Sequence, residues 1–234
     1  MSQRYFVTGT DTEIGKTTIA AGLLHAARLR GLSTAAVKPV AAGCETTVAG
    51  LRNDDALALQ AECNPQLDYE LLNPVALAPP IAPHIAAREA GLTLTAGQLA
   101  AACSRVFERG AQLTLVEGAG GWRVPLNDRQ TLADLAIELG IPVILVVGLR
   151  LGCINHALLT AEAIAADGLR LAGWVANQVD PQMDRQQHNL QTLRELLPAP
   201  CLGVVPRIEP LSAAAVAAHL QLDTLIAPTS GMSS

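Results

Sequence analysis

The sequence has few aromatic residues, few charges and no long apolar run, and each shortage excludes a class of protein. Only 3% of the 234 residues are aromatic although 50% are hydrophobic, so Ala, Leu, Val and Ile must build the core. The longest apolar stretch, residues 141–149, is far shorter than the roughly 20 residues that span a membrane as a helix. We therefore expect a globular protein without a membrane partner.

Charge and cysteine usage exclude further classes. The net charge is −5 and no Lys/Arg run occurs, which argues against nucleic acid or an anionic membrane surface as a partner. The five cysteines are scattered without a Cys-X-X-Cys pair, which argues against a disulfide framework or a zinc site. Residues 1–7 show no signal-peptide pattern, so we expect a cytoplasmic protein.

Short β-branched runs alternate with longer Ala- and Leu-rich stretches along the chain. The predicted strands are residues 4–9, 34–40, 113–117, 142–148, 171–179 and 202–205. The predicted helices are residues 16–30, 54–62, 96–110, 131–139, 154–167, 184–196 and 211–220. This alternation predicts an α/β fold whose central sheet is mostly parallel and covered by helices on both faces.

The composition changes too little along the chain to mark a domain boundary. Residues 1–228 are therefore predicted to form a single domain, within which the Pro-rich residues 74–83 form a surface loop. The Ser- and Gly-containing residues 229–234 are predicted to be a disordered tail.

The glycine-rich segment between the first predicted strand and helix carries the strongest functional signal. It reads Gly9-Thr-Asp-Thr-Glu-Ile-Gly-Lys-Thr-Thr18, with five residues between its glycines where the GxxxxGK[ST] pattern has four. Such a loop presents backbone N–H groups and a lysine to nucleotide phosphates. We interpret it as a phosphate loop in which Lys16 bridges the β- and γ-phosphates and Thr17 binds Mg²⁺. The alternative is a glycine turn that begins a helix.

Charged residues also stand at the ends of two later strands. Lys38 lies at the carboxyl end of the second predicted strand, two residues before its last residue, and Glu117 ends the third, just before Gly118-Ala-Gly-Gly121. The carboxyl ends of parallel strands face the ligand crevice. There Lys38 is suited to stabilise an anion beside the γ-phosphate, and Glu117 to bind a metal. The alternatives are a surface lysine and an ordinary turn.

Three other segments allow two interpretations each. Asp54 and Asp55 either cap the helix that follows or bind Mg²⁺. The residues from Gly152 to His156 either bind a carboxylate through free N–H groups or simply begin a helix. Asn177 ends a strand, where an amide can bind a purine edge, and its spacing to Asp180 is also similar to the guanine-reading element of GTPases without its Lys.

Together these segments resemble the dethiobiotin synthetase family, whose phosphate loop also has five residues between its glycines. The matching strings are Tyr5–Thr17, Val37–Ala41, Gly50–Gln60, Val116–Trp122, Pro142–Gly148, Leu151–Ala157 and Gly173–Asn177. They cover most of the chain to about residue 206. The resemblance implies a P-loop NTPase-like fold and a homodimer with the substrate site at its interface.

The resemblance also implies a reaction in biotin biosynthesis. A dethiobiotin synthase joins 7,8-diaminononanoate and CO₂ into a cyclic urea, with ATP as cosubstrate and Mg²⁺ as cofactor. The expected intermediates are a carbamate and a carbamic–phosphoric mixed anhydride. The implied catalytic residues are Lys38, Lys16 and Thr12, and the implied metal ligands are Thr17, Asp55 and Glu117.

Binding residues follow from the same resemblance. The implied nucleotide-binding residues are Glu13, Ile14, Gly15, Lys16, Thr17, Thr18, Asp55, Glu117, Asn177, Gln178, Pro206, Arg207 and Ile208. The implied substrate-binding residues are Thr12, Lys38, Ala42, Gly118, Ala119, Gly120, Leu151, Gly152, Cys153, Ile154 and Asn155. At Ala42, four residues after Lys38, family members often have a hydroxyl residue.

Three other functions are compatible with a phosphate loop. A P-loop ATPase switch that positions other proteins usually has a second lysine early in the loop, where this chain has Asp11, and a basic amphipathic tail for membranes. Residues 211–225 contain no Lys or Arg. A small-molecule kinase would leave a phosphorylated product, whereas the synthetase releases free phosphate. A pure nucleotide-binding module would show no turnover that depends on the diamine.

Overall fold

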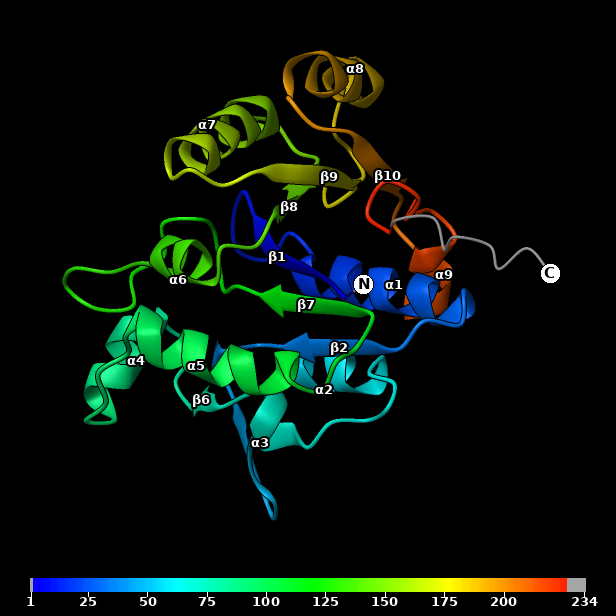
Figure 1. The fold of residues 1–234 in the computed structure, drawn as a ribbon. Helices are drawn as coiled ribbons and strands as arrows, with labels where there is room; N and C mark the ends of the chain where they lie inside the picture. Colours follow the sequence, from blue (N-terminus) through cyan, green and yellow to red (C-terminus); the bar gives the residue numbers. More distant parts are fainter. Residues whose placement is uncertain (1, 227–234) are drawn as a thin grey trace.

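A computed structural model describes residues 2–226, in which six parallel strands form a central sheet (Figure 1). The strand order is β10-β9-β8-β1-β7-β2. The strands are β1 (Gln3–Gly9), β2 (Thr34–Val37), β7 (Leu113–Glu117), β8 (Val143–Gly148), β9 (Leu171–Asn177) and β10 (Cys201–Val205). The predicted disordered tail, residues 229–234, lies outside the described residues.

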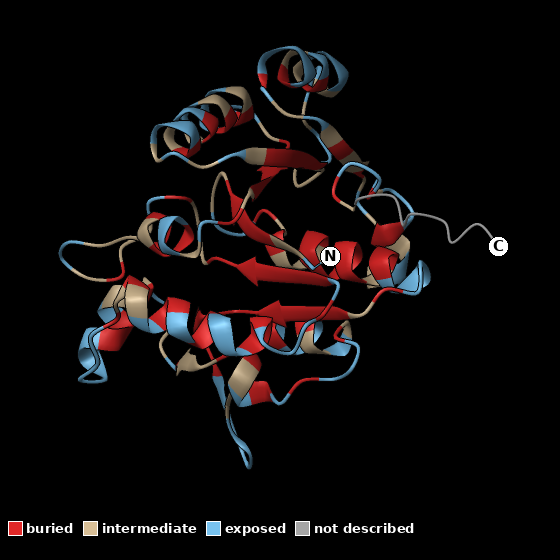
Figure 2. Ribbon diagram, in the orientation of Figure 1, coloured by how far each residue is buried: buried red, intermediate tan, exposed pale blue. Residues whose placement is uncertain are grey.

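Helices cover both faces of this sheet, as predicted. They are α1 (Lys16–Leu29), α2 (Asp54–Ala61), α3 (Tyr69–Leu72), α4 (Pro83–Glu89), α5 (Ala96–Phe107), α6 (Leu132–Leu139), α7 (Cys153–Ala166), α8 (Gln186–Leu196) and α9 (Ala213–Ala217). Side chains alternate between the faces of a strand. In β8, Ile144 and Val146 accordingly join the main core, whereas Leu145 and Val147 join a second core with α7 and α8. The sheet is therefore buried on both sides (Figure 2).

The register of the central strands brings three distant segments to one edge of the sheet. Val7 of β1 pairs with Glu117 of β7, and Val37 of β2 pairs with Val116. Gly9 pairs with Val146 on the other side. The carboxyl ends of β1, β2 and β7 therefore lie together, and the segments that follow these strands meet there.

The predicted strand 34–40 is wrong in its second half. β2 ends at Val37, and the N–H of Lys38 donates to the carbonyl of Leu72 (2.8 Å) instead of continuing the ladder. Pro39 has no N–H for a central strand. The chain then enters β3 (Val40–Ala42), which pairs with β6 (Val75–Leu77) in a separate two-stranded sheet.

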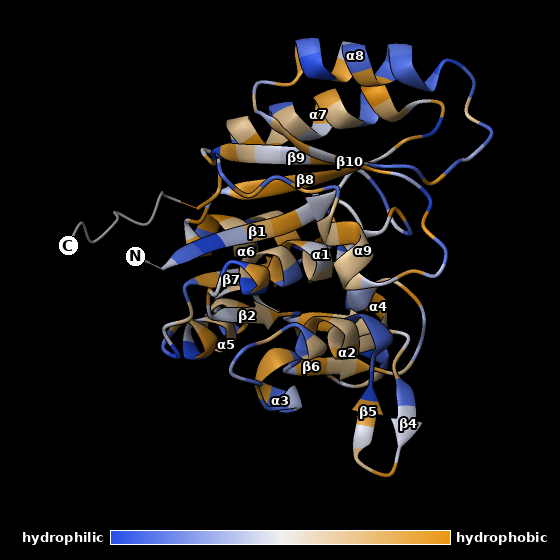
Figure 3. Cartoon of the chain, turned by 90° about the vertical axis from the view of Figure 1, so that its right-hand side faces the viewer, coloured by the Kyte–Doolittle hydropathy of each residue, from blue (hydrophilic) through white to orange (hydrophobic). Residues whose placement is uncertain are grey.

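The predicted surface loop 74–83 is also wrong, because it contains β6 and the first residue of α4. Strands of three residues are too short to show a period in the sequence. For the same reason the sequence does not predict the hairpin of β4 (Glu45–Thr47) and β5 (Gly50–Arg52), which projects from the molecule (Figure 3). α8 and α9 begin two residues later than predicted, and α9 ends three residues earlier. Within residues 2–226, no helix combines the length and apolar character that crossing a membrane requires.

Candidate functional site

A cavity of about 700 Å³ lies at the carboxyl edge of the central sheet. It is lined by Thr12, Glu13, Gly15, Lys16, Thr17, Thr18, Lys38, Ala41, Ala42, Asp55, Pro80, Ile81, Ala82, Pro83, Ala119, Gly120 and Val124. The lining combines the phosphate loop, the residues after β2, the start of α2 and the glycine loop after β7. The fold thus brings together in one cavity most of the residues that the sequence predicts to bind phosphates.

The phosphate loop is shaped by close contacts between its own atoms and a neighbouring strand end. Gly15 has φ +82°, and a Cβ there would lie 2.3 Å from Nδ2 of Asn177, so only glycine fits. The same Nδ2 donates to the carbonyl of Ile14 (2.8 Å). Lys16 Nζ donates to the carbonyl of Asp11 (2.9 Å) and therefore reaches back across the loop. The loop begins α1, as its sequence context predicts.

Lys16 and Lys38 are the only lysines of the sequence, and both lie in this cavity. Nζ of Lys38 lies 2.5 Å from Oε1 of Glu117 and 3.0 Å from Oδ2 of Asp55. Thr17 Oγ1 donates to the same Glu117 oxygen (2.7 Å). Segments from four places in the chain therefore share one hydrogen-bonded cluster of one ammonium group, two carboxylates and a hydroxyl. Lys16 lines the same cavity but donates to its own loop.

Burial and neighbouring charges shift the pKa values of the two lysines in opposite directions. Burial lowers the pKa of Lys16 to about 8, although the carboxylate of Glu117 partly opposes this. Burial alone would also lower the pKa of Lys38, but Glu117 and Asp55 outweigh it and the pKa is raised. Lys38 likewise outweighs the effect of burial on Asp55, whose pKa is lowered. Lys38 is therefore a permanent cation at neutral pH, whereas Lys16 loses its proton more easily.

The ambiguity at Asp54 and Asp55 is resolved by their neighbour Asn53. Asn53 is the N-cap of α2, and its side chain accepts a hydrogen bond from the N–H of Ala56 (3.2 Å). The two aspartates therefore lie in the first turn, where they are favoured by the helix dipole but are not needed as caps. Asp55 contacts Lys38 and lines the cavity, so its carboxylate belongs to the site.

The cluster has oxygen atoms that could serve as ligands of a divalent cation. Oε2 of Glu117 is buried without a hydrogen-bond partner among the described residues, so a strong acceptor is left unused. Thr17 and Asp55 add a hydroxyl and a second carboxylate. Within the described part of the chain, no group of three His, Cys, Asp or Glu side chains is arranged to hold a metal. Two carboxylates are nevertheless enough for a cation that takes its other ligands from phosphates and water.

The glycine loop after β7 approaches the phosphate loop closely. The N–H of Gly118 donates to the carbonyl of Val7 (3.0 Å), which holds the start of this loop against β1. A Cβ on Gly120 would lie 3.3 Å from Oγ1 of Thr12. The Thr12 hydroxyl therefore lies between the two loops. Ala42 lines the cavity with its methyl group and offers no hydroxyl.

The predicted base-binding residues lie beside the phosphate loop but outside the cavity lining. Asn177 contacts the loop through Ile14, as described above. The N–H of Gln178 donates to the carbonyl of Val205 (2.9 Å), and the N–H of Arg207 donates to the Gln178 side chain (3.4 Å). These contacts place Gln178 against the chain that contains Pro206 and Arg207. A neighbouring hollow of about 430 Å³ shares Thr17, Thr18 and Asp55 with the cavity.

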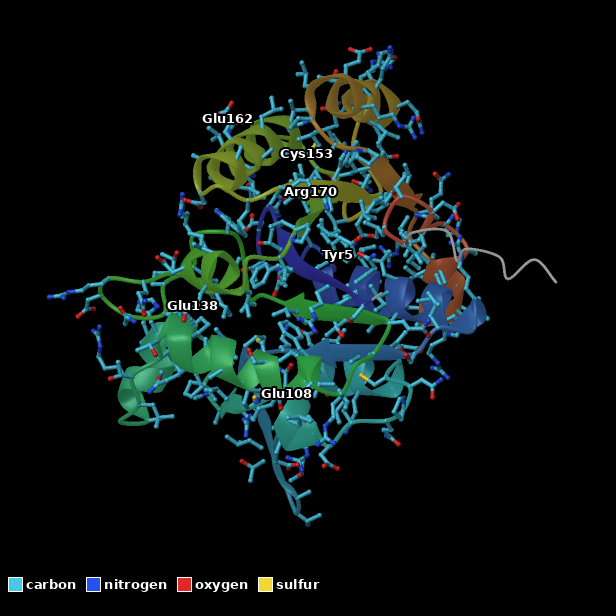
Figure 4. The ribbon with its side chains drawn as sticks, viewed as in Figure 1. Tyr5, Glu108, Glu138, Cys153, Glu162 and Arg170 are labelled. Atoms are coloured by element: carbon cyan, nitrogen blue, oxygen red, sulfur yellow. The ribbon has the colours of Figure 1, made fainter. Side chains whose placement is uncertain are left out.

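The predicted substrate segment, Leu151–Asn155, does not line the cavity. Leu151 is 91% exposed. Cys153 is buried in the second core where α7 faces the sheet, whereas Glu162 of the same helix points outward (Figure 4). The N–H of Cys153 already donates to the carbonyl of Arg150 (3.0 Å). The thiol of Cys153 is therefore unavailable to a ligand in the free chain.

Sequence reasoning missed one wall of the cavity and one ion pair. The wall is the Pro-rich segment from Pro80 to Pro83, which was interpreted only as a loop. The ion pair joins Arg150, after β8, to Asp11 of the phosphate loop. The strand order places β8 beside β1, but nothing in the sequence shows that order, so neither contact had a local signal.

The fold and the phosphate loop together define the class of P-loop nucleoside triphosphatases (NTPases). Structures of distant sequence share the fold. The MinC:MinD cell division protein complex of Aquifex aeolicus matches with a TM-score of 0.57 at 12% identity, over 94% of this chain and 88% of that chain. A ParA family ATPase from Chlorobium tepidum TLS matches with a TM-score of 0.56 at 12% identity, over 93% and 98%. A family profile described as an AAA domain matches residues 3–215.

Relatives of much higher identity narrow this class. The chain is 68% identical to the ATP-dependent dethiobiotin synthetase BioD of Pseudomonas aeruginosa (strain UCBPP-PA14), over 94% of this chain and 97% of the relative. It is 60% identical to the protein of that name from Cellvibrio japonicus (strain Ueda107), over 95% and 97%. The chain belongs to the ATP-dependent dethiobiotin synthetase family.

Proposed function

We propose that this chain forms dethiobiotin from 7,8-diaminononanoate, CO₂ and ATP, with release of ADP and phosphate. It is an ATP-dependent ligase that closes a ring by forming C–N bonds. One observation carries the proposal: the only two lysines of the chain line one cavity with Thr17 and Asp55, and the buried Glu117 bonds both Lys38 and Thr17. This arrangement suits a reaction in which two anions must meet.

The reaction consists of three steps. A neutral amine of the substrate attacks CO₂, forms a C–N bond and loses a proton, which gives an anionic carbamate. A carbamate oxygen attacks the γ-phosphorus of ATP, and ADP leaves, which gives a carbamic–phosphoric mixed anhydride. The second amine attacks the carbamate carbon, phosphate leaves with the C–O bonding pair, and the nitrogen loses a proton as the ring closes.

The chain's own residues lower the repulsion in the second step. Lys16 lies at the start of α1, where it can contact the β- and γ-phosphates together with the backbone N–H groups of the loop. Lys38 carries a positive charge at neutral pH because two carboxylates raise its pKa. A fixed cation beside the γ-phosphate stabilises charge that develops as the carbamate attacks. Thr12, whose hydroxyl lies between the two loops, would contact the carbamate or the amine.

Thr17, Asp55 and Glu117 would hold Mg²⁺ as the cofactor. When bound, Mg²⁺ supplies two positive charges and orients the phosphate oxygens. The hydrogen-bonded cluster has two carboxylates and one ammonium, that of Lys38, and therefore a net negative charge that the ion would neutralise. The free Oε2 of Glu117 is the acceptor best suited to the ion, because no protein group satisfies it among the described residues.

The proposal extends to a homodimer in which Leu151–Asn155 completes the substrate site of the partner. Leu151 (91% exposed), just before α7, and Leu159 (57% exposed), in the middle of α7, leave apolar surface on this part of the chain. Large exposed apolar side chains suit an interface between subunits. The substrates are small metabolites, and we propose a cytoplasmic location.

The test is one assay that follows two products together. Purified protein is mixed with ATP, Mg²⁺, bicarbonate and 7,8-diaminononanoate, and free phosphate and the cyclic urea are measured by phosphate detection and mass spectrometry. We expect equal amounts of both products and neither product without the diamine. Phosphate release without the urea would overturn the proposal, and a phosphorylated diamine would indicate a kinase instead.

A further inference from the structure

Asp11, the third residue of the phosphate loop, makes three polar contacts with its own loop and with a neighbouring one. Its Oδ1 accepts the N–H of Thr12 (2.8 Å), and its carbonyl accepts Nζ of Lys16 (2.9 Å). Its Oδ2 pairs with the guanidinium of Arg150. One residue therefore connects the first turn of the loop, its lysine and a cation from another segment.

Arg150 is held in place by backbone contacts on both sides. The preceding residue, Leu149, donates its N–H to the carbonyl of Asn177 (2.7 Å). The carbonyl of Arg150 accepts the N–H of Cys153, which closes the turn into α7 (3.0 Å). The N–H of Thr10 donates to the carbonyl of Val146 (3.0 Å), so the loops after β1 and β8 leave the sheet side by side.

A negative charge at Asp11 is unfavourable for a nucleotide site unless it is neutralised. Asp11 lies five residues before Lys16 and one before Thr12, its carbonyl bonds the Lys16 ammonium, and its carboxylate acts electrostatically on the same ammonium. Like charges brought together oppose binding. Arg150 is the basic side chain that pairs with this carboxylate.

We propose that Arg150 is a positioning residue that neutralises Asp11 and thereby maintains the affinity of the phosphate loop for ATP. Its guanidinium acts through Asp11 and does not contact the nucleotide. The inference goes beyond the proposed function, because it concerns nucleotide affinity and is tested without turnover. If the wild-type protein bound ATP but formed no dethiobiotin, the proposed function would fail and this inference would still be testable.

The experiment is a double-mutant cycle read by ATP affinity, with isothermal titration calorimetry in Mg²⁺ and no diamine. The variants are Arg150→Met, Asp11→Asn and their combination. Asn at position 11 can still accept the Thr12 N–H, so it removes the charge while keeping the turn. Arg150→Met keeps an unbranched stem without the guanidinium. Arg30→Met is the matched control, because Arg30 also pairs with an aspartate, Asp223, at the far end of α1 (2.7 Å).

Arg150→Met should weaken ATP binding about fivefold, the size typical of a half-exposed charge pair. The same change in the Asp11→Asn background should have less than about a twofold effect, because no carboxylate remains to be neutralised. Arg150→Lys should restore affinity to within about twofold, and Arg30→Met should leave it unchanged. Raising NaCl from about 0.05 M to about 0.5 M should shrink the loss in Arg150→Met, which a purely structural defect would not show.

Two results would overturn the inference. Equal losses from Arg150→Met in both backgrounds would mean that Arg150 acts on the nucleotide directly or on the fold. An Arg150→Met protein with wild-type ATP affinity would mean that the pair has no role in binding. Thermal unfolding of each variant shows whether it is folded. If Arg150→Met does not fold, the ATP affinities of the Asp11→Asn and Arg150→Lys proteins still test the inference.

Discussion

The phosphate-loop region and the start of α7 differ in how complete they are within one chain. Around the phosphate loop, Lys16, Lys38 and Glu117 are buried and each makes a hydrogen bond. At the start of α7, Leu151 is 91% exposed and no residue of the segment Leu151–Asn155 lines the cavity. The part of the site that binds the nucleotide is therefore organised within one chain before any ligand binds. The part proposed to bind the substrate carboxylate, Leu151–Asn155, requires the surface of a partner subunit.

The two regions have different tasks, which are the activation of ATP and the binding of one end of the substrate. Activating ATP requires charges at fixed positions, and a buried cluster keeps them there without reorganisation. Binding one end of a long, flexible substrate requires only a contact surface, which can be shared between subunits. The predictions below perturb each region in turn.

Lys38→Ala should have the largest effect. Removing the cation beside the γ-phosphate should lower kcat for dethiobiotin by about 1000-fold, while ATP affinity changes by less than about tenfold. Product formation and calorimetric ATP binding would be measured on the same preparation. Loss of ATP binding with unchanged turnover per bound ATP would contradict the assigned role. Thermal unfolding is needed as a control, because the variant leaves the buried Glu117 without its ammonium partner.

Asp55→Asn should lower kcat by about 100-fold, because a cation site would lose one of its two carboxylates. Its neighbour provides a matched control: Asp54 lies in the same first turn of α2 but does not pair with Lys38. Asp54→Asn should change kcat by less than about threefold. Activity measured over a series of Mg²⁺ concentrations should show a higher requirement in Asp55→Asn only. Equal effects of both variants would contradict the assignment of Asp55.

Leu151→Glu should disrupt the interface proposed at the start of α7 and leave the phosphate-loop region intact. A carboxylate in an apolar interface is costly, so the variant should become monomeric and lose about tenfold in kcat/KM for the diamine. ATP affinity should stay within about twofold of the wild type. Leu29→Glu is the control, because Leu29 is 74% exposed at the opposite end of α1. Analytical ultracentrifugation would show whether mass and activity fall together; a dimeric, impaired variant would contradict the shared site.

Amine-reactive labelling sharpens the difference between the two lysines, and the expected several-fold difference in labelling rate is the smallest effect of the set. The pKa of Lys16 is lowered to about 8, so a substantial neutral fraction exists at pH 8, whereas the raised pKa keeps Lys38 charged. An acylating reagent should modify Lys16 several-fold faster than Lys38, with a rate that rises through about pH 8. Peptide mass spectrometry separates the two, since the chain has no other lysine. ATP should protect Lys16, and preferential labelling of Lys38 would contradict the pKa order.

Much of the part of the site that binds the nucleotide could be predicted, because its signals are local or follow from parallel strands. Gly9–Thr18 is one continuous segment, so its glycines, Lys16 and Thr17 stand at short spacings that the sequence shows directly. Lys38 and Glu117 were placed correctly because the carboxyl ends of parallel strands share an edge. The strands of the central sheet are also recognisable as runs of apolar residues, except where Pro39 removes the chain from the sheet.

The sequence by itself determined the α/β class, the phosphate loop and the resemblance to the dethiobiotin synthetases, because these depend on residue types at short spacings. Only the tertiary structure decided that Pro80–Pro83 forms a cavity wall and that Arg150 meets Asp11. It also decided that Asp55, and not Asp54, contacts Lys38. These contacts join residues that are 17 to 139 positions apart, and which of them form depends on strand order and helix packing that no short pattern encodes.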